Sequence, residues 1–151
     1  MAVRNSITNV VSMVNEYIAL TKPKIIILLL ITSVGGMFLA DRGIPAIGLI
    51  AIVLLGGTLA ASGANALNQY LEKDIDALMK RTAKKRPLVS KSIPSSHALI
   101  IGVATNLVAF ALLWSLVNLA SAILTLSASI FYIGVYTMLL KRRTVQNIVI
   151  G

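Results

Sequence analysis

The sequence contains no cysteine, a single histidine and only five acidic residues. The absence of cysteine excludes disulfide scaffolds, thiolate metal sites and cysteine nucleophiles. Charged residues make up 13% of the 151 residues, whereas hydrophobic residues make up 57%, and the mean hydropathy is +0.87. This composition is too apolar for an ordinary soluble domain, and it indicates an integral membrane protein.

Positive charge is abundant, with a net charge of +9, but it is unevenly placed. Thirteen of the fourteen lysines and arginines lie near the N-terminus or in the segments 73–91 and 141–143, and the other, Arg42, follows Asp41. Basic residues gathered in alternate connections follow the positive-inside pattern. We therefore expect the N-terminus and both basic segments to be cytoplasmic, and we expect no nucleic-acid partner.

Four apolar runs are long enough, with their flanks, to cross a bilayer. An interfacial lead-in helix is expected within residues 1–22, where Lys22 and Lys24 would extend to lipid headgroups and Pro23 would begin the first span. The expected spans are 25–40, 46–71, 97–117 and 119–140, with a polar cytoplasmic loop at 72–94. Residues 145–151 begin another apolar stretch that is too short to cross. The fold class expected is all-α, a polytopic transmembrane bundle of which residues 1–151 form a part.

Oxygen-bearing side chains recur at helical spacing near the end of the second run. Asn68, Glu72 and Asp76 are separated by four residues each, which places them on one stripe of a helix, and Asn65 extends that stripe. Mg²⁺ takes oxygen ligands and often shares them with substrate phosphates. Asp74 lies about 200° around the helix from this stripe, so we expect it to be solvated rather than a metal ligand.

A dense basic segment follows the stripe. Cations beside carboxylates suit a polyphosphate whose leaving oxygen becomes negative. A helix end that emerges from a membrane also carries charge simply because it meets water, but asparagines at the membrane boundary favour a functional site. The candidate diphosphate-binding residues of the segment are Lys80, Arg81, Lys85 and Arg86.

The pattern Asn68-Gln69-x-x-Glu72-x-x-x-Asp76, with Lys80-Arg81-Thr82 and Arg86-Pro87-Leu88, resembles the first acidic motif of the UbiA family of intramembrane prenyltransferases. Gln69 and Glu72 stand where that pattern usually has aspartate, and the spacing from Arg81 to Arg86 is one residue longer, so Lys85 or Arg86 takes the second basic position. These variants, together with Thr21-Lys22-Pro23-Lys24 and Gly134-Val135-Tyr136, are similar to the subgroup that farnesylates haem.

The resemblance implies an enzyme that transfers a farnesyl group from farnesyl diphosphate to the vinyl group of haem B. It implies Mg²⁺ held by Asn68, Glu72 and Asp76, with Asn65 as a further candidate. It also implies that the diphosphate binds to Lys80, Arg81, Lys85 or Arg86, and to Tyr136 and Lys141 from the next cytoplasmic segment. The family carries a second acidic motif in a C-terminal half, which we expect to be missing from this chain.

Other interpretations stay open at this point. The acceptor could be a quinone precursor or a chlorophyll-type ring. From another class, the chain could be a half-transporter whose polar stripe binds cations, or an inactive truncated remnant. His97, the only histidine, could bind haem iron, but a polar role at the membrane interface is the simpler interpretation.

Overall fold

The structure, a computed structural model, describes the backbone of residues 2–78, 86–90 and 92–143, and the side chains of 11–78, 86–90, 92–141 and 143. These residues form helices, and no strand occurs among them. In chain order the elements are α1 (Ala2–Thr21), α2 (Pro23–Asp41), α3 (Ile47–Leu78), α5 (Ser95–Leu116), α6 (Leu119–Ile130), the π-helix η1 (Phe131–Leu140) and α7 (Lys141–Arg143).

Four helical stretches are long and apolar enough to cross a membrane, which confirms the expected fold class. They are α2, α3, α5 and the continuous stretch from α6 into η1. Their outer faces carry exposed large apolar side chains such as Ile31, Leu39 and Leu124, as lipid-facing helices require. The orientation of the bundle in the membrane stays a prediction.

One boundary differs from the expectation. The second span was expected to end near residue 71, but α3 continues to Leu78. No glycine or proline interrupts residues 71–78, and Ile75 and Leu78 continue the apolar pattern beyond the polar stripe. The predicted loop at 72–94 is therefore wrong for its first seven residues, and Glu72 and Asp76 lie on the rigid helix that carries Asn68.

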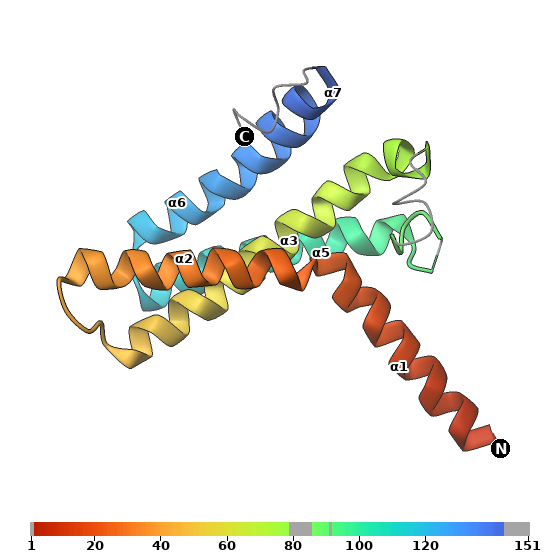
Figure 1. Cartoon of the computed structure of the whole chain (residues 1–151), viewed down its shortest axis with the longest axis horizontal. Helices are drawn as coiled ribbons and strands as arrows, with labels where there is room; N and C mark the ends of the chain where they lie inside the picture. Colours follow the sequence, from red (N-terminus) through yellow and green to blue (C-terminus); the bar gives the residue numbers. More distant parts are fainter. Residues whose placement is uncertain (1, 79–85, 91, 144–151) are drawn as a thin grey trace.

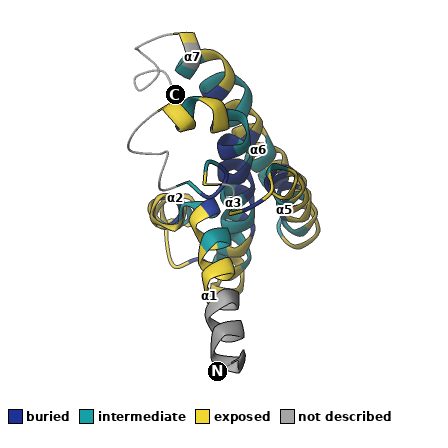
Figure 2. Cartoon of the chain, turned by 90° about the vertical axis from the view of Figure 1, so that its right-hand side faces the viewer, coloured by how far each residue is buried: buried dark blue, intermediate teal, exposed yellow. Residues whose placement is uncertain are grey.

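Helix α3 is the centre of the bundle. Figure 2 shows it between α2 and α5, with the buried residues gathered along it and the exposed residues on the outer helices. Its closest neighbour is α5, because Gly63 and Gly102 let the two backbones approach. A β-carbon at Gly63 would lie 2.7 Å from the carbonyl oxygen of Gly102. The two helices are therefore in close backbone contact at this crossing.

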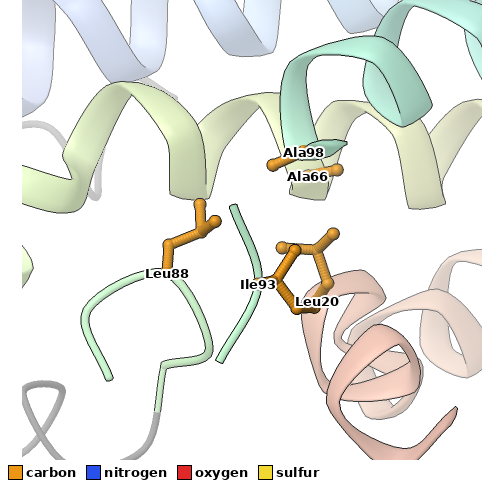
Figure 3. Packing of buried hydrophobic residues seen from close by; sticks show 5 residues of the cluster. All are labelled: Leu20, Ala66, Leu88, Ile93 and Ala98. Atoms are coloured by element: carbon orange, nitrogen blue, oxygen red, sulfur yellow. The ribbon is translucent and has the colours of Figure 1, made fainter. Parts of the chain in front are cut away.

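Helix α1 leaves the bundle at an angle, so that the N-terminus lies far from the other helices (Figure 1). The change of direction occurs at Lys22, whose φ of 56° places it in the left-handed region, and Pro23 then begins α2. The C-terminal part of α1 packs on the bundle, through Tyr17 as well as Leu20. Leu20 meets Ala66 of α3 and Ala98 of α5 in a small apolar cluster with Leu88 and Ile93 (Figure 3).

The fourth span changes its winding before it ends. After Ile130 the chain continues as the π-helix η1, in which the hydroxyl of Thr137 donates to the carbonyl of Tyr132, five residues earlier, at 2.9 Å. The wider turn points Thr137 inward, where it is buried. It also brings Lys141, the first residue of α7, toward α3. Sequence patterns did not predict this segment, which is a winding often found at functional sites.

Candidate functional site

The predicted stripe is buried inside the described structure. Asn68, Glu72 and Asp76 are each exposed by 2% or less. Carboxylates at a solvated helix end would be far more exposed. The alternative interpretation, that these residues are polar only because the helix end meets water, therefore does not hold. Buried carboxylates need partners, because an unpaired buried charge strongly destabilises a fold.

Arg86 is the first partner. Its Nη1 lies 3.3 Å from Oε2 of Glu72 and also forms an ion pair with Oδ2 of Asp76. The short turn at Pro87–Ser90, which follows Arg86 and buries Leu88, holds this segment near α3. Two carboxylates one helical turn apart thus converge on a single nitrogen. The point that this nitrogen occupies is where one cation can contact both acids.

Lys141 is the second partner, from the other end of the chain. Its Nζ lies 2.6 Å from Oε1 of Glu72, so both oxygens of Glu72 face cations. The expectation that Lys141 reaches this site is consistent with that geometry. Tyr136 instead stacks on Tyr132, with ring centroids 5.5 Å apart.

Lys22 is a third cation at the site, and the sequence interpretation missed it. Its Nζ donates to Oδ1 of Asn68 at 2.8 Å, while Nδ2 of Asn68 donates to Oγ1 of Thr137 at 3.0 Å. Burial is the main cause that lowers the pKa of Lys22 to about 8, helped by the charges of Arg86 and Lys141 and opposed by the two acids. The expectation that Lys22 extends to headgroups is therefore wrong, whereas Lys24 is exposed.

A signal for Lys22 was present in the sequence. The residue precedes Pro23 at the start of a span, so it lies at the same membrane level as the polar end of the next span. Thr137 carried no such signal, because the π-helix that turns it inward is not visible in an apolar pattern.

An apolar cavity of about 380 Å³ lies beside this polar cluster. It runs between α2, α3 and α6, and small residues of α3 form its floor. Asn65, one turn from Asn68, and Tyr132, whose carbonyl accepts from Thr137, line it as well. The cavity therefore comes within one helical turn of Asn68, although no residue of the charged cluster lines it. Its lining includes Ile25, Leu29, Gly57, Ala60, Ala61 and Ala64.

Some candidate residues are placed elsewhere or are not described. Nδ2 of Asn65 donates to the carbonyl of Thr21 at 2.8 Å, so this amide faces the end of α1. His97 accepts or donates a 2.8 Å hydrogen bond between its Nδ1 and the hydroxyl of Tyr17. Lys80, Arg81, Lys85 and the start of a fifth span at 145–151 lie outside the described residues.

The side-chain oxygens of the stripe are the kind of ligand that a hard divalent cation binds. Asn68, Glu72 and Asp76 offer only oxygen, the ligand type that Mg²⁺ prefers. Within the described residues, no group of three His, Cys, Asp or Glu side chains could hold a metal ion by itself. The two acids and one amide therefore form an incomplete set, which fits an ion that keeps substrate oxygens and water among its ligands.

The sequence is similar to known proteins over most of its length. The model of the UbiA prenyltransferase family matches residues 29–151. The chain is 54% identical over 135 residues to protoheme IX farnesyltransferase 1 of Saccharopolyspora erythraea, covering 89% of this chain and 43% of the relative. It is 52% identical over 138 residues to protoheme IX farnesyltransferase of Streptomyces avermitilis, covering 91% of this chain and 45% of the relative. The chain thus spans less than half the length of these relatives, and no solved structure matches it.

Proposed function

This chain belongs to the UbiA prenyltransferase family, and we propose that it contributes one side of the active site of a protoheme IX farnesyltransferase. The observation that carries the proposal is the convergence of Arg86, Lys141 and Lys22 on the oxygens of Glu72, Asp76 and Asn68. The names of the relatives supply the substrate class, and the cluster supplies the groups that a diphosphate and its metal ion need.

The reaction begins when the C1–O bond of farnesyl diphosphate breaks, and the electron pair leaves with the diphosphate. Arg86, Lys141 and Lys22 stabilise the negative charge that develops on the leaving oxygen, because preformed cations in a buried site need little reorganisation. Lys80, Arg81 and Lys85 are further candidates for this role. Mg²⁺, when bound to Asn68, Glu72 and Asp76, would neutralise part of the same charge.

The allylic cation that remains is attacked by a vinyl carbon of haem B, and water adds to the resulting cation with loss of a proton. Until that attack, water must be kept from the farnesyl cation. The apolar cavity beside Asn65 and Tyr132 is suited to this, because it lies near the charged cluster and runs between apolar helices. We propose that the isoprenoid tail occupies it.

Partner exchange is required for this binding. In the described structure the three main candidate metal ligands already contact a cation: Asn68 contacts Lys22, Glu72 contacts Lys141, and Asp76 contacts Arg86. If Mg²⁺ alone displaced these cations, they would be left without partners, and diphosphate alone would leave the acids unpaired. Mg²⁺ and diphosphate are therefore expected to bind together, each taking one side of the broken ion pairs.

The proposal is tested in a chimera in which this chain is continued by the remaining length of the Streptomyces avermitilis relative. The chimera is reconstituted in nanodiscs with Mg²⁺ and farnesyl diphosphate, and haem B, a quinone precursor or a chlorophyll-type ring is offered as acceptor. Mass spectrometry should detect a farnesylated product with haem B. If a product formed only with another acceptor, the proposal that haem B is the acceptor would be overturned. Ion flux without use of farnesyl diphosphate would favour the half-transporter interpretation.

A further inference from the structure

The junction between α1 and α2 is held by amide side chains of α3. Nε2 of Gln69 donates to the carbonyl of Leu20 at 2.9 Å and to that of Ala19 at 3.4 Å. Nδ2 of Asn65 donates to the carbonyl of Thr21 at 2.8 Å. Three successive carbonyls at the end of α1 are thus satisfied from one face of α3. These are the groups that a helix C-terminus leaves without intrahelical partners.

The burial of the two amides shows that this contact is not incidental. Gln69 is 2% exposed and Asn65 is 4% exposed. The amide oxygen of Gln69 has no hydrogen-bond partner among the described residues. The hydrogen bonds of this buried side chain in the described structure are therefore the two that its nitrogen donates. A buried polar side chain without partners destabilises a fold, and here the carbonyls of α1 provide them.

The residue that follows these carbonyls is Lys22. Its backbone has a φ of 56°, a left-handed conformation that is unfavourable for a non-glycine residue and persists only where the surroundings enforce it. That conformation ends α1, begins α2 at Pro23 and directs the lysine side chain to Asn68. Leu20 fixes the same junction from the apolar side, against Ala66 of α3 (Figure 3).

We propose that Asn65 and Gln69 are positioning residues, which hold the end of α1 on α3 so that the ammonium group of Lys22 is delivered to the diphosphate site. They act through Lys22 rather than as metal ligands. The proposal rests on the proposed function for the use that it gives to Lys22, but the junction itself can be tested without any substrate. It also gives Gln69 a role, at a position where the family pattern usually has an acid.

The junction is tested by spin-label distance measurements on the full chain in nanodiscs. The chain has no cysteine, so cysteines placed at the exposed residues Met13 and Leu39 are the only labelling sites, and they report the angle between α1 and α2. A single narrow distance is expected for the parent chain. Gln69→Met and Asn65→Leu keep the size of the side chain but remove the donor, so each should turn that distance into a broad distribution.

Two controls separate this effect from general unfolding. Asn106→Leu makes the same change in a buried amide of α5 that donates only to Gly102 of its own helix among the described contacts, and it should leave the Met13–Leu39 distance narrow. A second label pair at Leu55 of α3 and Leu107 of α5 should stay narrow in every variant. An unchanged junction in Gln69→Met and Asn65→Leu, or equal broadening in Asn106→Leu, would overturn the proposal.

A double-mutant cycle tests whether Gln69 acts through Lys22. In the chimera, Gln69→Met should displace Lys22 and so remove its hydrogen bond to the anion. The binding of inorganic pyrophosphate with Mg²⁺ should then weaken by about tenfold, as expected for the loss of one hydrogen bond to a charged group. In a Lys22→Met background the same change should have almost no further effect. If the two substitutions weakened pyrophosphate binding by independent factors, Gln69 would act independently of Lys22.

Tighter metal binding in Gln69→Glu with an unchanged junction would make Gln69 a ligand instead. Absence of pyrophosphate binding in the parent chimera would count against the proposed function, whereas the spin-label result would still decide the junction.

Discussion

Glu72 is the residue on which most of the charged contacts depend. It is almost fully buried, and its two oxygens face Arg86 and Lys141, which lie 14 and 69 residues further along the chain, respectively. Asp76 shares Arg86 with it. The acids therefore do two things: they hold three segments together in the ligand-free chain, and they present oxygens to any cation that replaces Arg86.

Removal of one acid should abolish turnover. Asp76→Ala in the chimera deletes a candidate metal ligand and is expected to lower the rate of haem farnesylation by at least about a hundredfold, as loss of one group that stabilises a transition state does. Membrane insertion should be unchanged. The matched control is Asp74→Ala, since Asp74 is an exposed acid of the same helix turn. Activity retained in Asp76→Ala would remove Asp76 from the site.

Lys22 should give the ligand-free chain an unusual dependence on pH. Its pKa is about 8 in the folded chain and about 10.5 when it is solvated, so between these values the unfolded chain binds more protons than the folded one. Stability should therefore rise with pH from about 8 to 10.5, and the destabilising contribution should be constant below pH 8. The measurement is the midpoint of unfolding in sodium dodecyl sulfate across this range. Subtracting the Lys22→Met profile isolates the lysine, and identical slopes in both proteins would contradict the assignment.

At the scale of single residues, sequence spacing predicted the shared stripe of Asn68, Glu72 and Asp76 because helical periodicity alone determines it. It could not show that Arg86 and Lys141 satisfy Glu72, since those contacts depend on how distant segments return to α3. The sequence also led to the wrong placement of Lys22 at the lipid headgroups, because its contact with Asn68 likewise depends on how distant segments pack. The hydrogen bond to Asn68 joins residues 46 positions apart.

The elements place these residues by two local departures from regular α-helix. The left-handed Lys22 separates α1 from α2, and the π-helix η1 turns Thr137 toward Asn68. Both departures occur at the level of the charged cluster. Apolar periodicity predicts where a span begins and ends, but it carries no information on a change of winding within a span, so η1 was not predicted.

The crossing of α3 and α5 holds the central helix, which carries Asn68, Glu72 and Asp76, against its main neighbour in the bundle. Gly63→Ala should destabilise the bundle by about 1–3 kcal/mol, because the new methyl group would meet Thr105, Asn106 and the backbone of Gly102. The measurement is again unfolding in sodium dodecyl sulfate. Gly48→Ala is the matched control, since a β-carbon there meets nothing within 4 Å, and its stability should be unchanged or slightly raised. Equal stability of the two variants would show that the crossing is not tight.

The molecule as a whole is a set of membrane helices with an incomplete polar site at one end. The four spans could be predicted from hydropathy, because the bilayer imposes length and apolarity on each of them. The family could be identified from the acidic and basic motifs, and the comparison confirms it. The residues that would complete the proposed metal site could not be located, because the relatives are more than twice as long as the part that aligns with this chain.

From this charge arrangement we expect cooperative binding of Mg²⁺ and diphosphate to be a property of the whole site rather than of one residue. Three cationic side chains and three oxygen-bearing side chains contact one another in the described structure. A metal ion and an anion that arrive together can exchange all of these partners without leaving a buried charge unpaired. Either one alone cannot.

Isothermal titration calorimetry of the chimera with Mg²⁺, with inorganic pyrophosphate and with both tests this claim most directly. We predict little heat from either component alone and a saturable heat when both are present, which Asp76→Ala removes and Asp74→Ala leaves in place. No heat from the two together, or equally tight binding of each one alone, would contradict the account.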